Sequence, residues 1–120
     1  MAAFVTRHTE SFGTAPQIAP QDLAEIAAMG FKTVVNNRPD GEGGAEQPGN
    51  AEIEAAAKAA GLHYAYLPVI SGQITEQQAR DFADLLANSP SPLLAFCRSG
   101  ARSQNLYQLA HMVSGTPPAA

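Results

Sequence analysis

The sequence predicts an α/β fold with a mainly parallel central sheet and helices on both faces. Short runs of apolar and β-branched residues alternate along the chain with longer segments of helical spacing. Residues that begin or end helices stand at the boundaries, such as Pro20, Gly30 and Gly61. Strands separated by helices pair in parallel, and both faces of the sheet are then covered. In such sheets ligands bind beyond the carboxyl ends of the strands, so residues that follow a strand are the first candidates for a site.

The first half of the chain predicts a helix, a strand, a polar loop and a second helix. Residues 20–29 have the apolar spacing of an amphipathic helix, and residues 31–37 are rich in β-branched side chains, which predicts a strand. Residues 38–49 are dense in Gly and Pro, which predicts a loop. Asn50 is a preferred helix cap, and the Ala-rich segment 51–60 predicts the helix that it begins.

The second half predicts two further pairs of a strand and a helix. Residues 62–69 predict a strand, and Thr75 with Gln78 forms the pattern of a capping box at the start of a helix. The apolar run 92–96 predicts a short buried strand, and residues 101–113 carry helical spacing. The apolar face of this last helix is expected to contain Leu106, Leu109 and Met112.

Length and composition predict one soluble globular domain. The chain has 120 residues, of which 45% are apolar and 15% charged, and we place the domain at residues 1–113, with a flexible tail at 114–120. No apolar run is long enough to span a membrane, the first residues lack the features of a signal peptide, and a single cysteine allows no internal disulfide. We therefore expect a cytoplasmic protein without a membrane partner. The net charge of −4 argues against nucleic acid as a partner.

Cys97 is the only cysteine, and it stands between a predicted strand and a predicted helix. The free backbone N–H groups and the positive end of the dipole at a helix start form a cradle for an anion. Arg98 and Arg102 add positive charge, and Gly100 allows the backbone to turn tightly. Such surroundings favour the thiolate, so we expect Cys97 to be a nucleophile near neutral pH. A buried structural cysteine is the alternative, but it does not explain the polar and charged residues that follow.

The chain resembles the phosphatase-like domain of bacterial beta-lactamase hydrolase-like proteins, whose fold is that of dual-specificity phosphatases. The resemblance covers roughly residues 10–112. It rests on Gln17 with residues 20–23, on residues 34–42, on Gln47 and Pro48, on residues 67–69, and on the Cys97 loop, residues 97–103. The resemblance implies a cysteine phosphatase-like α/β fold. It also implies one of two activities attached to this family by analogy, phosphate-ester hydrolysis or sulfane-sulfur transfer.

The spacing within the loop bears on this choice of chemistry. Cysteine phosphatases place five residues between Cys and Arg, whereas four residues separate Cys97 from Arg102. Four is the spacing of rhodanese-like sulfurtransferases, whose active-site loop the segment CRSGARS resembles. Phe96 stands where phosphatases usually have His, and residues 68–73 contain no carboxylate to protonate a leaving group. Loss of a general acid typically costs about 10²–10⁴-fold in rate, whereas sulfite or a thiolate leaves readily as an anion.

The predicted catalytic residues are Cys97 and Arg102. The residues predicted to bind the anionic substrate are Arg98, Ser99, Gly100, Ala101, Ser103 and Arg38. Arg38 follows a strand as Cys97 does, so it either reaches the same rim or pairs with Asp40 or Glu42. The chain has no cluster with metal-ligand spacing and no dinucleotide fingerprint, so we expect neither a metal nor a cofactor.

These observations predict a sulfurtransferase. Cys97 would take the outer sulfur of thiosulfate or of a persulfide, form a Cys97 persulfide, and pass that sulfur to an acceptor thiol. The alternative is a phosphatase that acts on a phosphate ester through a phospho-Cys97 intermediate. A third possibility is a non-catalytic module that binds anions, but such a module would need no nucleophilic thiol.

Overall fold

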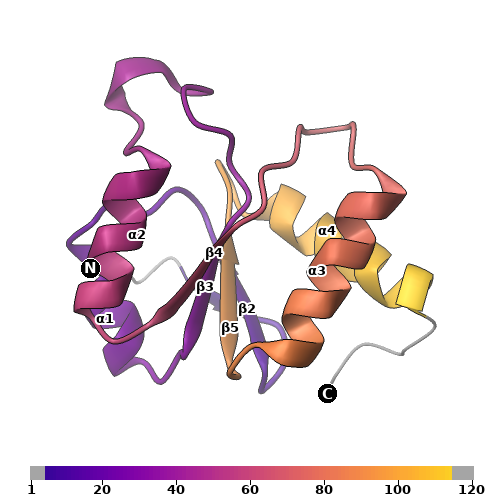
Figure 1. Cartoon of the computed structure of the whole chain (residues 1–120), viewed down its shortest axis with the longest axis horizontal. Helices are drawn as coiled ribbons and strands as arrows, with labels where there is room; N and C mark the ends of the chain where they lie inside the picture. The colour runs from indigo at the N-terminus through magenta and orange to yellow at the C-terminus, as the bar shows by residue number, and fades with distance from the viewer. Residues whose placement is uncertain (1–4, 115–120) are drawn as a thin grey trace.

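The computed structural model describes residues 5–114. In this range a five-stranded sheet of order β1-β2-β5-β3-β4 runs through the middle of the molecule. Helices α1 and α2 cover one face, and α3 and α4 cover the other (Figure 1). The strands are β1 (Thr6–Arg7), β2 (Phe12–Ala15), β3 (Thr33–Asn36), β4 (His63–Tyr66) and β5 (Leu93–Phe96). The helices are α1 (Asp22–Ala28), α2 (Asn50–Ala59), α3 (Glu76–Asn88) and α4 (Ala101–Ser114), with a short 3-10 helix, η1 (Gly44–Glu46), after β3.

The sheet is mainly parallel, which confirms the predicted fold class. β5 pairs in parallel with β2 on one side and with β3 on the other, and β4 pairs in parallel with β3. Phe96, at the end of β5, stands in register between Ala15 of β2 and Asn36 of β3. The chain therefore leaves three neighbouring strands at the same edge of the sheet. This edge is where a parallel sheet places its ligand site.

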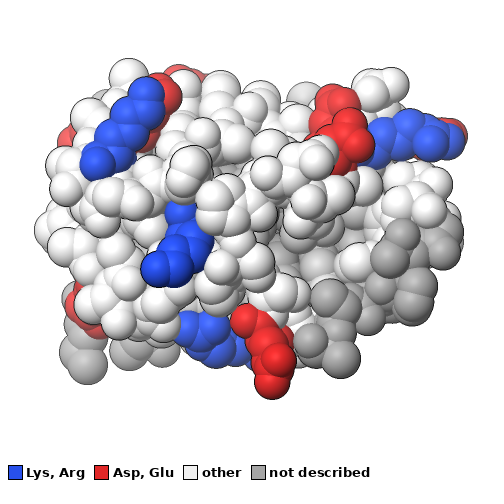
Figure 2. Space-filling view, turned by 60° about the horizontal axis from the view of Figure 1, so that its bottom comes forward, with Lys and Arg blue, Asp and Glu red and all other residues white. Residues whose placement is uncertain are grey.

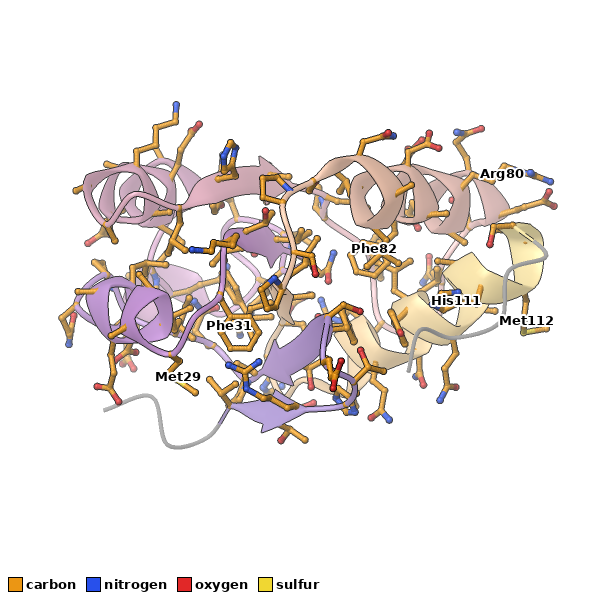
Figure 3. The ribbon with its side chains drawn as sticks, turned by 90° about the horizontal axis from the view of Figure 1, so that it is seen from below. Met29, Phe31, Arg80, Phe82, His111 and Met112 are labelled. Atoms are coloured by element: carbon orange, nitrogen blue, oxygen red, sulfur yellow. The ribbon has the colours of Figure 1, made fainter. Side chains whose placement is uncertain are left out.

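Two apolar cores hold β5 from both faces of the sheet. Its side chains alternate, so Phe96 lies in the core under α1 and α2, while Leu93 lies in the core under α3 and α4. Figure 3 shows Phe31 on the first of these sides and Phe82, on α3, on the second. Full burial of one such side chain contributes about 1.5–3 kcal/mol. The position of β5, and of the residue that follows it, is thus set by packing.

The two N-terminal strands were not predicted. Residues 6–15 contain no apolar or β-branched run, and Phe12–Ala15 becomes a strand by pairing along β5. Asn50 was predicted as the cap of α2, but it is the first helical residue and Gly49 takes the cap position. The Asp40 side chain accepts a hydrogen bond from the backbone N–H of Asn50 at 2.7 Å. The carboxylate of Asp40, and not the side chain of Asn50, therefore accepts a backbone hydrogen bond at the start of α2.

The buried face of α4 also differs from the prediction. Leu106 is buried as expected, whereas Met112 is 75% exposed and lies at the outer edge of the molecule (Figure 3). Tyr107 is buried instead, and its ring stacks on Phe12 with the centroids 3.8 Å apart. Because tyrosine carries a hydroxyl as well as a large apolar ring, hydropathy spacing alone did not place it in the core.

Two further predictions concern the start of α3 and the end of α4. The predicted capping box is confirmed, since Thr75 Oγ1 accepts from the Gln78 backbone N–H and the Gln78 side chain accepts from the Thr75 backbone N–H. α4 includes Ser114, the first residue of the predicted tail, and residues 115–120 lie outside the described residues. The division into one domain and a tail stays a prediction.

The surface mixes acidic and basic side chains. On the face shown in Figure 2, Lys and Arg side chains are scattered and several lie beside Asp or Glu. Exposed pairs at helical spacing, such as Arg80 with Glu76 and Lys58 with Glu54, are of this kind, and each stabilises its helix by only about 0.2–0.5 kcal/mol. None of the helices between residues 5 and 114 has the length and apolar character needed to cross a membrane.

Candidate active site

Cys97 lies directly after β5, beneath the start of α4. Its backbone N–H donates to Ala15 O at 3.3 Å, and its Sγ accepts a hydrogen bond from the Gly100 backbone N–H at 3.0 Å. Gly100 has a φ of +95°, a backbone conformation that is unfavourable for residues other than glycine. The sulfur therefore accepts a backbone hydrogen bond at the positive end of a helix dipole, a position typical of cysteine nucleophiles. The residue is fully buried.

Arg102 lies in the first turn of α4, and its side chain is only 9% exposed. One terminal nitrogen, Nη1, donates to Val69 O and to Glu42 Oε2, both at 3.0 Å. The other, Nη2, donates to Glu42 Oε1 at 3.0 Å. Nε is buried and has no hydrogen-bond partner among residues 5–114. Glu42 thus compensates the charge of a buried guanidinium, whose Nε–H has no acceptor in the described part of the chain.

Glu42 joins two arginines. Its Oε1 also accepts from Arg38 Nε at 3.0 Å, and Arg38 Nη1 donates to Gln17 Oε1 at 3.1 Å. The hydrogen bonds from Arg102 hold the pKa of the Glu42 carboxyl below its usual value; Arg38 acts in the same direction, and burial opposes both. Glu42 is therefore an ionised carboxylate in this site. Of the two predicted alternatives for Arg38, the structure shows the pairing with Glu42, and this pairing brings Arg38 to the Arg102 cluster.

The remaining predicted residues of the loop fall into two groups. Arg98, Ser99 and Ala101 are exposed, whereas Ser103 is fully buried. Ser103 Oγ donates to Asn37 Oδ1 at 2.8 Å, which ties the start of α4 to the end of β3. The roles of these residues in binding a substrate stay predictions.

Asn37 was not predicted as part of the site, yet it connects the strand ends there. Its backbone N–H donates to Phe96 O at 2.9 Å and its side-chain N–H to Leu67 O at 2.9 Å. Its backbone carbonyl oxygen accepts a hydrogen bond from the Val69 backbone N–H at 3.0 Å. Together with the bond from Ser103, these contacts fix the segment that supplies Val69 O to Arg102. A buried Asn at the end of a β-branched strand was the available signal in the sequence.

Apart from Glu42, the carboxylates of residues 38–49 are either bonded elsewhere or exposed. The Asp40 side chain accepts from the start of α2, as described above, and Glu46 is exposed in η1. The segment after β4 that reaches Arg102, residues 68–73, contains no acidic residue. Within the described part of the chain, no three His, Cys, Asp or Glu side chains are grouped so that they could hold a metal ion.

A cysteine and an arginine thus stand at the junction of a central parallel strand and a helix. The model of the family "Beta-lactamase hydrolase-like protein, phosphatase-like domain" matches residues 4–114. The chain belongs to this family. A beta-lactamase hydrolase-like protein of Agrobacterium fabrum is 41% identical over 100 residues, which are 83% of this chain and 22% of that protein. The chain therefore spans about a fifth of the length of that relative.

Solved structures place this family domain in the cysteine phosphatase fold. A protein of Neisseria meningitidis that is described provisionally as a phosphatase is 31% identical, with a TM-score of 0.84 that covers 98% of this chain and 81% of that one. P. aeruginosa TpbA, in complex with pTyr, shares the fold at 16% identity, with a TM-score of 0.67 over 93% of this chain and 64% of that one. The predicted family and fold are confirmed. The comparisons do not support the predicted sulfurtransferase and agree better with its alternative, a phosphatase.

Proposed function

We propose that this phosphatase-like domain hydrolyses phosphate monoesters through a phospho-Cys97 intermediate. The observation that carries the proposal is the Cys97 sulfur at the start of α4, with the Gly100 N–H on it and Arg102 close by in the first turn. This arrangement supplies a nucleophile together with donors for a phosphoryl group. Support also comes from the 31% identity to the Neisseria meningitidis protein.

The reaction has two steps, and each forms one bond to phosphorus and breaks another. In the first, the Cys97 thiolate attacks phosphorus, an S–P bond forms, and the ester P–O bond breaks with its electron pair on the leaving oxygen. In the second, water attacks the phosphocysteine, the S–P bond breaks, and orthophosphate leaves while the thiolate is restored. Arg102 and the loop amides stabilise charge on the phosphoryl oxygens in both steps.

The leaving group narrows the substrate class. Residues 68–73 offer no acid, and Glu42 is held ionised by Arg102 and Arg38. An aryl oxide leaves without protonation far more readily than an alkoxide, so aryl phosphates are the substrates that suit this site. We therefore propose esters of the phosphotyrosine class; pTyr is bound in the TpbA structure that shares this fold.

Sulfur transfer is the second candidate, because one observation favours it. Four residues separate Cys97 from Arg102, so the loop is one residue shorter than that of the phosphatases it otherwise resembles. In this reaction the thiolate attacks the outer sulfur of thiosulfate, the S–S bond breaks and sulfite leaves with the electron pair. An acceptor thiolate then removes the outer sulfur of the Cys97 persulfide.

Parallel assays separate the two candidates. The purified protein and its Cys97→Ser variant are compared for hydrolysis of p-nitrophenyl phosphate, a phosphotyrosine peptide and a phosphoserine peptide, and for sulfite release from thiosulfate with an added thiol. The proposal predicts Cys97-dependent hydrolysis of the two aryl esters, with the phosphoserine peptide slower by about 10²-fold or more. Sulfite release without any ester hydrolysis would replace the proposal with the second candidate.

A further inference from the structure

The Arg102 guanidinium carries a charge that is nearly removed from water. Its side chain is 9% exposed, and the acceptors that hold it are one backbone carbonyl, Val69 O, and one carboxylate, Glu42. A buried charge without such partners would be strongly destabilising, and the side chain would turn to find others. The orientation of Arg102 therefore depends on Glu42.

The hydrogen bonds divide the guanidinium into two edges. Glu42 bonds both terminal nitrogens, Nη1 and Nη2, and so takes the end of the group. Val69 O takes a further hydrogen of Nη1. Nε, with the second hydrogen of Nη2, forms the side edge, and Nε has no partner among residues 5–114. A guanidinium offers a paired donor fork at either edge, and each matches two oxygens of a carboxylate or phosphate.

We propose that Glu42 is a positioning residue, which holds the end of the Arg102 guanidinium so that Nε, on its side edge, stays free of protein acceptors and can donate to the substrate oxyanion. Arg38 and Gln17 act through Glu42 and do not touch the substrate. The inference rests on the proposed function, because it assigns the free edge of Arg102 to the phosphoryl group.

The contacts around Arg38 support its indirect role. Its Nε is used by Glu42 and its Nη1 by Gln17, whose backbone N–H in turn donates to Arg98 O at 3.2 Å. The chain also closes over Arg38 at Gly43, where an added Cβ would lie 2.6 Å from Arg38 Nη2. The guanidinium of Arg38 is thus held between Gln17, Glu42 and Gly43.

The charges are consistent with this arrangement. Glu42 alone would neutralise Arg102 and weaken its attraction for an anion. Arg38 adds a second positive charge at the same carboxylate, so the three side chains keep one net positive charge. A phosphoryl oxyanion then meets an oriented donor edge in a locally positive site.

Orthophosphate, the product of the proposed reaction, provides a test that does not depend on turnover. It is titrated into ¹⁵N-labelled protein while the shifts of the Gly100 and Ala101 amides report binding in the loop. We expect Glu42→Gln, which keeps the shape and removes the charge, to weaken binding about tenfold. The matched control Glu46→Gln changes an exposed carboxylate of η1 and should bind as the wild type does.

The route through Arg38 is tested with a double-mutant cycle. Arg38→Gln should weaken orthophosphate binding less than Glu42→Gln, and the double variant should bind no more weakly than Glu42→Gln alone. The kcat/KM for p-nitrophenyl phosphate should fall in the same order. The ¹⁵N spectra of each variant show whether it is folded. If Arg38→Gln does not fold, the result for Glu42→Gln still tests the positioning role.

The outcomes separate this inference from the proposed function. Unchanged or tighter binding by Glu42→Gln would overturn the positioning role and show Glu42 to be a spectator or a competitor of the anion, while the proposed function stands. Additive losses in the cycle would show that Arg38 acts on anion binding independently of Glu42 and would overturn its indirect role. A wild-type protein whose loop amides do not respond to orthophosphate would overturn the proposed function, and this inference with it.

Discussion

The Cys97 loop and the loop of residues 38–49 meet at Arg102, and different forces hold them. The Cys97 loop follows β5, whose side chains are buried in both apolar cores. The other loop is exposed from residue 40 to residue 46 and is held by polar contacts, such as those of Gln47 with Gly43 and Pro39. The nucleophile is therefore placed by packing, and the arginine is oriented by a few hydrogen bonds. Substitutions that disturb the packing of β5 should reduce stability, whereas substitutions in the polar contacts that orient Arg102 should reduce activity.

The largest effect should come from the packed side. Phe96 is fully buried at the end of β5, so Phe96→Ala removes a large core side chain and leaves a cavity. We expect a loss of about 3–5 kcal/mol in the free energy of unfolding, measured by urea denaturation. The exposed Met112→Ala on α4 provides a control of similar chemistry. A loss below about 1 kcal/mol would contradict the claim that packing of β5 places the nucleophile.

Arg102→Lys should affect activity more than stability. An ammonium group cannot present a donor fork to Glu42 at one edge and to an oxyanion at the other. We expect kcat/KM for an aryl phosphate to fall by about 10²-fold, while the exposed Arg98→Lys changes it little. Equal and mild losses for both variants would remove Arg102 from its assigned role.

Gly100→Ala should have an intermediate effect on both properties. The φ of +95° at Gly100 is unfavourable for alanine, although an added Cβ would meet its nearest neighbours, Ala15 C and O, at an ordinary 3.5 Å. The expected cost is therefore backbone strain of about 1–2 kcal/mol, together with a shift of the N–H that donates to the Cys97 sulfur. Chemical denaturation and the rate of Cys97 alkylation measure the two effects. Full stability with an unchanged alkylation rate would show that the turn does not need glycine.

The smallest effect should be a pH dependence from Glu42. Its pKa is lowered in the folded protein, chiefly by hydrogen bonds from Arg102. The ion pair therefore stabilises the folded protein fully at pH values above the usual Glu pKa of about 4.3. This stabilisation is lost as the pH falls through the lower pKa of the folded state. Unfolding curves from pH 3 to pH 7 should show a steeper acid loss for the wild type than for Glu42→Gln. Identical curves would mean that this ion pair contributes nothing to stability.

The fold was largely predictable because its signals are local. Hydrophobic spacing predicted α1 and α4, the β-branched run predicted β3, and the pattern of Thr75 with Gln78 predicted the capping box that begins α3. β2 could not be found in this way, since residues 12–15 become a strand only by pairing with β5. Tyr107 was missed because its burial depends on stacking with Phe12, a contact between distant parts of the chain.

The candidate site was predictable mainly where it is contiguous, apart from Arg38, whose pairing with Glu42 was one of two predicted alternatives. Cys97, Gly100 and Arg102 follow one another in the sequence, so the turn and its chemistry could be inferred from it. Glu42 is far from Arg102 in the sequence. The hydrogen bonds between them form only when the segments that follow β3 and β5 come together in the fold. Spacing within the loop favoured sulfur transfer, whereas the fold and the comparisons favour a phosphatase.

A phosphatase mechanism at this site requires a covalent phosphoryl group on Cys97. Intact-protein mass spectrometry of samples quenched in acid during turnover of p-nitrophenyl phosphate tests for it, with Cys97→Ser and a thiosulfate-treated sample in parallel. We expect a gain of one phosphoryl group that peptide mapping assigns to Cys97 and that the variant lacks. A Cys97 that gains one sulfur from thiosulfate, but never a phosphoryl group from the ester, would contradict it.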